Sequence, residues 1–285
     1  GKGIRGAPRD ALIADITPPE VRGRSFGLRQ ALDTVGAIGG PLLALAGMAY
    51  FVGDFQTVFW IAVIPAVLAV LLIVVGVREP EDRAGNGLQK PRWHWRDALR
   101  LQPALWVVVA IAFVFTLARF SEAFLLLRAQ DAGFSVATAP LVMVVMTLVY
   151  ALSAYPAGIA VDAGKAPQLL AGGLVALFIA DVVLARATGP TAVLAGAGLW
   201  GLHMGLTQGL LAALVAAAAP ADLRGTAFGV FNLASGVALL IASVVAGWLW
   251  DAYGPALTFY VGAGFTAIAG AGLWWRRGAL RFAEG

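Results

Sequence analysis

Long apolar runs alternate with short polar segments along the whole chain. A helix needs roughly 20 mostly apolar residues to cross a bilayer, and most of the runs reach that length. The pattern therefore predicts an all-α polytopic membrane protein with nine helices. They are expected near residues 1–17, 26–51, 56–77, 104–127, 138–161, 167–186, 191–217, 226–250 and 256–275.

The polar segments indicate how the chain is oriented in the membrane. Most Lys and Arg residues between the spans fall in one alternate set of loops, which includes the basic stretch 78–103 and the C-terminal tail. Positively charged loops stay in the cytoplasm. We therefore expect a multi-pass protein of the bacterial inner membrane with a cytoplasmic C-terminus.

Composition narrows the classes of function. Of the 285 residues, 60% are hydrophobic and 13% are charged; there is no Cys and there are two His residues. These counts argue against a disulfide framework and against a metal site built on Cys or His. The net charge of +4 follows from the loops and gives no reason to expect nucleic acid binding. No nucleophile–base pair or phosphate loop is apparent, so we expect neither an enzyme nor a cofactor.

An internal repeat relates two helix–turn–helix segments. Residues 11–28 (ALIADITPPEVRGRSFGL) align without a gap with residues 213–230 (ALVAAAAPADLRGTAFGV). Arg22 and Gly23 recur as Arg224 and Gly225. Both copies are expected to run in the same direction, as in transporters built from two parallel halves.

With these features the chain resembles a major facilitator superfamily transporter, from its fourth helix to its twelfth. The segments GKGIRGAPRDALIAD and PPEVRGRSFGLRQALDTVGAIGGPLLA are similar to bacterial drug or small-solute efflux permeases. The resemblance implies two six-helix bundles, a central cavity and alternating access. It also implies about a hundred residues, or three helices, before Gly1.

The resemblance divides the chain into four parts. Residues 1–77 would be the last three helices of an N-terminal six-helix bundle, and 78–103 a cytoplasmic linker. Residues 104–275 would be the C-terminal bundle, and 276–285 a cytoplasmic tail. When full length, the protein is expected to be a monomer.

Two glycine motifs match family patterns. Gly36, Gly40 and Pro41 fit a GxxxGP motif associated with proton-coupled antiporters, although ordinary packing of small residues is an alternative. The segment 155–165 resembles a shortened form of a loop that has a gating role in the family. The alternative is that it is only a tight turn. Its corresponding residues are Gly158, Asp162, Gly164 and Lys165.

Charged residues inside the spans are candidates for transport because each is costly at depth unless it is paired or hydrated. Arg29 and Asp33 are separated by four positions, which places them on one helix face. Arg119 and Glu122 lie in the middle of the expected 104–127 helix. We expect Asp33 and Glu122 to carry protons or contact a cationic substrate, with the arginines tuning them. Structural ion pairs are the alternative.

Other residues are weaker candidates. Arg9 and Asp10 lie on the first span, and Asp15, near its end, is expected to pair with Arg22 or Arg24. Asp181 either lines the cavity or pairs with Arg186. The further cavity-lining candidates are His203, Gln208 and Asn232, and the expected packing glycines are Gly201, Gly205 and Gly209.

The favoured interpretation is a secondary transporter that exports a small solute in exchange for protons. A proton-coupled uptake symporter is the nearest alternative. A truncated, non-transporting module that binds a partner or senses a ligand is a third, from a different class. The sequence does not identify the substrate.

Overall fold

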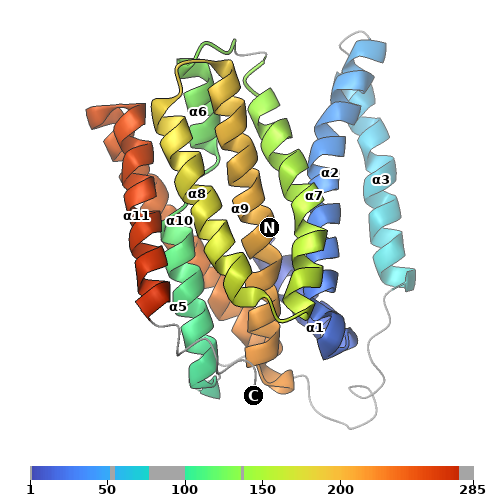
Figure 1. Cartoon of the computed structure of the whole chain (residues 1–285). Coiled ribbons are helices and arrows are strands. Elements are labelled where there is room, and N and C mark those ends of the chain that lie inside the picture. The colour runs from blue at the N-terminus through green and yellow to red at the C-terminus, as the bar shows by residue number, and fades with distance from the viewer. Residues whose placement is uncertain (1, 52–54, 77–99, 136–137, 276–285) are drawn as a thin grey trace. The chain divides into compact units, whose positions relative to one another are not determined.

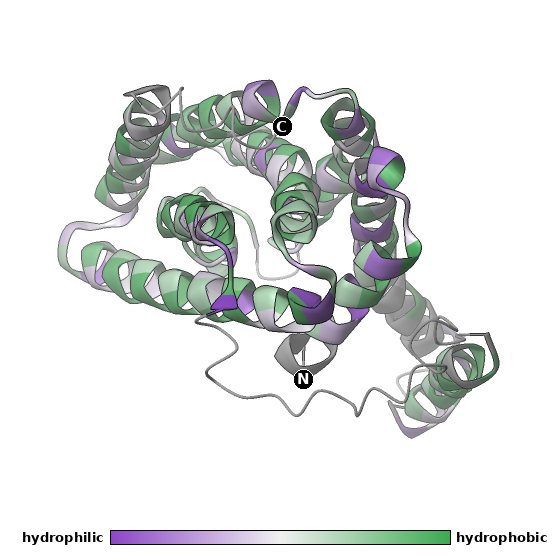
Figure 2. Cartoon of the chain, turned by 90° about the horizontal axis from the view of Figure 1, so that it is seen from below, coloured by the Kyte–Doolittle hydropathy of each residue, from purple (hydrophilic) through white to green (hydrophobic). Residues whose placement is uncertain are grey.

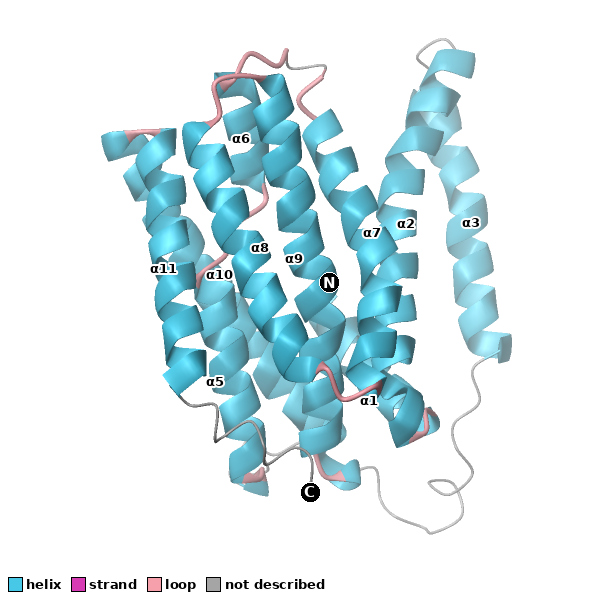
Figure 3. Cartoon of the chain, in the orientation of Figure 1, coloured by secondary structure: helices cyan, strands magenta, loops and turns pink. Residues whose placement is uncertain are grey.

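The computed structural model describes residues 2–51, 55–76, 100–135 and 138–275 (Figure 1). Throughout these ranges the regular structure is helical, and Figure 3 shows no strand in them. Most of the linker and the whole C-terminal tail lie outside the described residues. The helices are α1 (Lys2–Ile16), α2 (Arg22–Tyr50), α3 (Phe55–Gly76), α5 (Pro103–Leu117), α6 (Ala123–Asp131), α7 (Leu141–Asp162), α8 (Ala166–Arg186), α9 (Pro190–Ala218), α10 (Arg224–Tyr253) and α11 (Pro255–Trp275), with short 3-10 helices η1 (Pro19–Val21) and η3 (Ala221–Leu223).

The expected 104–127 helix is interrupted, which corrects the sequence analysis. It divides into α5 and α6, and a loop joins them (Figure 3). Ser243 on α10 accepts a hydrogen bond from the backbone N–H of Ser121 at 3.1 Å, which satisfies one polar group of the break. Non-helical backbone at membrane depth is tolerated where protein satisfies or buries it. Apolar periodicity alone could not reveal this break.

Four described helical segments are long and apolar enough to cross a membrane, by length and composition. They are Leu141–Asp162, Ala166–Arg186, Pro190–Ala218 and Ala221–Tyr253. Seen end-on in Figure 2, the helices are coloured mainly hydrophobic, and hydrophilic residues gather mostly at turns and helix ends.

Contacts divide the chain into two compact units. One contains Gly1–Thr34 and His94–Gly285, and the other contains Val35–Trp93. The boundary falls within α2, so its first part belongs to the larger unit. The smaller unit holds the rest of α2 and α3, whose apolar side chains such as Trp60 and Leu72 are exposed. Such side chains suit contact with lipid.

Small residues set the packing of the larger unit. Helix α9 packs against both α7 and α8, and α11 packs against α8. A Cβ atom added at Gly201 would overlap the Met146 carbonyl of α7, and one added at Gly205 would overlap Ser153. Close approach of backbones therefore depends on glycine at these positions.

The sequence repeat is also a structural repeat. In the first copy α1 leads through Pro18 and η1 into α2, and in the second α9 leads through Pro220 and η3 into α10. The backbone angles of the two prolines nearly coincide, at φ −55° and ψ 144° for Pro18 and φ −56° and ψ 145° for Pro220. The matched side chains Phe26 and Phe228 are fully buried and contact each other, with ring centroids 6.0 Å apart.

Candidate functional site

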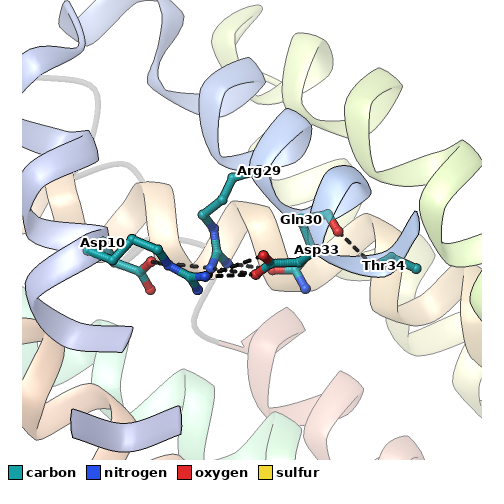
Figure 4. A network of polar contacts seen from close by, with 6 residues as sticks. Asp10, Arg29, Gln30, Asp33 and Thr34 are labelled. Atoms are coloured by element: carbon teal, nitrogen blue, oxygen red, sulfur yellow. Dashed lines mark hydrogen bonds and ion pairs between the residues drawn. The ribbon is translucent and has the colours of Figure 1, made fainter. Parts of the chain in front are cut away.

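Four charged side chains from α1 and α2 form a single network (Figure 4). Arg9 reaches Asp33 at 3.0 Å and Asp10 at 3.4 Å. Arg29 reaches Asp10 at 3.2 Å and Asp33 at 3.4 Å. Each carboxylate therefore contacts both guanidinium groups, and the four formal charges cancel. Opposite charges offset the cost of placing ionic groups at membrane depth.

The two carboxylates of this network differ in exposure. The Asp10 side chain is 12% exposed, whereas that of Asp33 is 46% exposed. Protonation of Asp33 would free Arg9 and Arg29 from one partner while leaving Asp10 in contact with both. Asp33 is therefore the more accessible carboxylate of the network.

A second polar group lies at the α5–α6 break. With the Gln208 amide oxygen turned toward the break, it accepts hydrogen bonds from both terminal nitrogens of Arg119, at 2.8 and 3.1 Å. Within the described structure, Arg119 and Glu122 form no ion pair, although their spacing suggested one. Glu122 instead precedes the first residue of α6, where the helix dipole favours a negative charge.

Tyr150 on α7 connects the two groups electrostatically, and sequence reasoning missed it. Its side chain is 5% exposed, and the charges of Arg119, Arg29, Glu122 and Asp33 all act on its hydroxyl. Because α7 is apolar along most of its length, no pattern marked this tyrosine. The charges of both predicted pairs thus act on one buried tyrosine.

In the described structure the remaining polar candidates form no hydrogen bond with these groups. His203 is buried between α8 and α9, where its Nδ1 lies 2.8 Å from the Gly173 carbonyl oxygen and its ring stacks on Phe115. Asn232 on α10 faces Gly6 of α1, whose added Cβ would lie 3.9 Å from the amide nitrogen. Asp181 is completely buried, and Arg186 does not pair with it but donates to the Tyr260 hydroxyl at 3.0 Å.

Asp162 joins the end of α7 to the start of α2. Its carboxylate accepts hydrogen bonds from the backbone N–H groups of Gly23 at 2.6 Å and Arg24 at 3.0 Å. The Arg24 side chain also reaches it at 3.0 Å. The first N–H groups of a helix have no partner within the helix and attract an anion. A side chain of α7 therefore caps the first turn of α2.

Glycines make that contact possible. An added Cβ at Gly23 would lie 2.6 Å from the Gly158 carbonyl oxygen, and one at Gly27 would lie 2.5 Å from that of Ala154. Gly164, with φ +73°, lies in the turn from α7 to α8, immediately before Lys165. The second-repeat counterparts Gly225 and Gly229 have no described atom within 4 Å of an added Cβ.

Asp15 makes the second contact between the halves. It was expected to pair with Arg22 or Arg24, and the structure adds a third arginine, because Arg224 reaches it at 2.6 Å. Arg22 donates to the Thr17 carbonyl oxygen at 3.3 Å. Burial lowers the pKa of Arg22, and the nearby charge of Arg224 acts in the same direction. The sequence repeat already predicts that these two arginines lie at the same end of the helices, and the fold adds the contact between Arg224 and Asp15.

The GxxxGP segment lies in α2, within the smaller unit. An added Cβ at Gly36 would have no described atom within 4 Å. The surroundings of Gly40 and Pro41 lie outside what the structure describes. The antiporter association of this motif stays a prediction.

Comparison with known proteins identifies the family. The profile of the Major Facilitator Superfamily matches residues 1–127 and 123–281. An uncharacterised MFS-type transporter of Methanocaldococcus jannaschii is 30% identical over 277 residues, which cover 95% of this chain and 68% of the relative. An uncharacterised protein of Mycobacterium bovis is 28% identical over 262 residues, or 88% of this chain and 62% of that protein.

Two solved structures share the fold. The human organic anion transporter MFSD10 superposes with a TM-score of 0.71 at 17% identity, and the proton:xylose symporter XylE with a TM-score of 0.70 at 15% identity. In both comparisons the match covers 93% of this chain and 66% of the other. The chain thus spans about two thirds of the transporters that it resembles.

Proposed function

The chain belongs to the major facilitator superfamily, and from that premise we propose that it exports a small solute in exchange for protons by alternating access. Family membership points to a multi-pass secondary transporter rather than an enzyme. The finer proposal, proton-coupled export, depends on the network of Arg9, Asp10, Arg29 and Asp33.

The proposed coupling follows from competition at Asp33. With the carboxylate ionised, Asp33 holds Arg9 and Arg29, and a cationic solute would have to displace these arginines. A proton arriving at Asp33 removes its charge, weakens both contacts and discharges any bound cation. The half-exposed position of Asp33 permits this exchange, and Asp10 keeps the arginines in place meanwhile.

Two contacts at one end of the helices are suited to the conformational change of alternating access. Asp162 with α2, and Arg224 with Asp15, hold the two halves together there. By the positive-inside argument this end is proposed to face the cytoplasm. Opening the cavity toward the cytoplasm would then require both contacts to break, and their re-formation would close it.

The decisive experiment uses the protein expressed from its complete gene and reconstituted in liposomes with an acidic lumen. Tetraphenylphosphonium serves as the cationic probe, and valinomycin with equal potassium on both sides clamps the membrane potential. Exchange for protons predicts accumulation of the probe in the lumen. The Asp33→Asn variant should fall to the level of empty liposomes, while Asp251→Asn, at the exposed end of α10, should behave as the wild type.

Other outcomes would redirect the proposal. Loss of the probe from the acidic lumen would indicate symport in place of antiport. Unchanged proton-driven flux in Asp33→Asn would remove this carboxylate from coupling. Absence of flux with tetraphenylphosphonium and with a neutral and an anionic probe would favour a non-transporting membrane module.

A further inference from the structure

Asp181 is a buried carboxyl group on α8, far along the chain from the charge network of α1 and α2. Asp181 of α8 is 0% exposed, and neither of its oxygens has a hydrogen-bond partner in the described structure. An added Cβ at Gly262 of α11 would lie 3.0 Å from its Oδ2 atom and 3.1 Å from the Phe120 ring. The carboxyl group thus lies directly behind Gly262 and beside Phe120.

Phe120 belongs to the loop between α5 and α6, so the surroundings of Asp181 include the helix break. Its ring contacts those of Phe124, Trp200 and Phe259, with centroids 5.2 to 5.3 Å apart. The Trp200 indole N–H is buried and also lacks a partner among the described residues. Two buried polar groups without partners near one helix break are costly. A carboxyl group that binds and releases a proton gives a reason for one of them.

A crevice leads toward this place from the outside of the bundle. It is a small crevice of about 50 Å³ between α10 and α11, with Phe120 and Gly262 in its wall. Ile241, Val245 and Phe265 line it and are each more than 40% exposed. In a bilayer such apolar side chains face lipid, so the crevice opens toward lipid. Asp181 does not line it but lies next to Gly262 in its wall.

No described charge compensates Asp181. Helix α8 packs against α9, α11 and α7. Arg186 of its own helix is bonded to Tyr260, and His203 lies against Gly173. The buried cation Arg128 of α6 also meets α8, but it is bonded to the carbonyl oxygens of Leu184 and Ala187. An ionised carboxylate without a partner is strongly disfavoured in an apolar interior, so the group is neutral there. The titratable side chains on the three packing helices are His203 on α9, Tyr260 on α11, and Tyr150, Tyr155 and Asp162 on α7.

We propose that Asp181 is a second proton-binding site, separate from the Asp33 network, and that Phe120 at the helix break controls its access from the α10–α11 crevice. In the described conformation the site holds its proton. A shift of the break that moves Phe120 would expose the carboxyl group and release it. The coupling role of this site rests on the proposed proton exchange, whereas its protonation does not.

The test is labelling with dicyclohexylcarbodiimide, which dissolves in lipid and reacts with protonated carboxyl groups. The acid proton moves to a carbodiimide nitrogen while the carboxyl oxygen bonds to the central carbon. The acyl group then shifts to nitrogen, so the entire reagent is retained. The full-length protein in liposomes is labelled over a pH series, and mass spectrometry locates the modified residue.

We expect Asp181 to be labelled at pH 7, where exposed carboxyl groups, with pKa values of about 4, are ionised. Labelling of this peptide should disappear in Asp181→Asn and remain in Asp251→Asn. A water-soluble carbodiimide should label Asp181 far less. Phe120→Ala should increase the labelling rate several-fold, whereas Phe265→Ala, at the outer wall of the crevice, should change it little.

Two results would overturn the inference. Absence of label on Asp181 at pH 7 in the folded wild-type protein would show that the group is ionised or unreachable. An unchanged rate in Phe120→Ala would remove the control by the helix break. Labelling of Asp181 without proton-driven flux would support this site and contradict the proposed function. Proton-driven flux without labelling would support the proposed function and contradict this site.

Discussion

Single residues that bridge separate helices carry much of the specificity of this fold, and Arg128 is a clear example. It lies on α6 with its side chain buried, donates to the Leu184 carbonyl oxygen at 2.8 Å and to that of Ala187 at 2.6 Å, and contacts Asp131. The last carbonyl groups of a helix have no partner within it. Arg128 therefore caps the end of α8 from a neighbouring helix.

The residue-scale prediction concerns this cap. Arg128→Met should destabilise the protein by about 2 kcal/mol or more, because two buried carbonyl groups lose their donor. Arg186→Met is the matched control, since that exposed side chain makes one hydrogen bond to Tyr260. Thermal unfolding in detergent, followed by size-exclusion chromatography, measures both. Equal melting temperatures for the two variants would contradict the capping role.

At the scale of elements, helix spacing is decided by which face of a glycine-rich helix meets a neighbour. Helix α9 carries Gly198, Gly201 and Gly205 within two turns. An added Cβ would overlap α7 at the last two, but at Gly198 it would lie 3.8 Å from Val145, an ordinary contact. The sequence shows the glycines, and the structure shows which of them the packing requires.

The element-scale prediction uses this difference. Gly201→Ala should destabilise the α7–α9 contact by about 1–3 kcal/mol, the usual range for an overpacked core. Gly198→Ala should be neutral or slightly stabilising, because alanine has the higher helix propensity. Melting temperatures of the two variants in the same detergent provide the comparison. A stable Gly201→Ala protein would show that the helices have room to separate.

At the scale of the whole molecule, the two halves of the repeat meet through matched positions. Phe26 packs on Phe228, and α1 packs along α10. Alternating access needs these surfaces to part during each cycle. A covalent bond across the α1–α10 contact should therefore stop transport without unfolding the protein.

The cross-linking prediction uses Gly6→Cys with Asn232→Cys, positions that face each other across this contact. These 285 residues contain no cysteine, so the two introduced thiols would be the only ones within them. Oxidation should reduce probe flux to the level of empty liposomes, and reduction should restore it. Each single variant should keep its flux under oxidation. A cross-linked protein that still transports would show that this contact does not open.

The sequence by itself determined the class of protein and the path of the chain. Apolar runs of membrane-spanning length predicted the helices, and the repeat at residues 11–28 and 213–230 predicted two equivalent turns, which Pro18 and Pro220 form with nearly identical angles. The family followed from the same segments. The helices, the turns and the family motifs each depend on residues close together in the chain, so the sequence alone is enough to predict them.

Only the tertiary structure decided which distant residues meet. The expected 104–127 helix is interrupted where Ser243 accepts a hydrogen bond from the backbone of Ser121. Arg224 contacts Asp15. Asp181 is buried next to Gly262 without a hydrogen-bond partner among the described residues. Each of these outcomes depends on side chains from helices far apart in the chain. In a soluble protein, hydrophobic periodicity identifies the helix face that packs against the core. In a membrane protein nearly every helix face is apolar, so periodicity does not identify the packed face. The choice of neighbour then depends on close packing and on the pairing of a few buried polar groups.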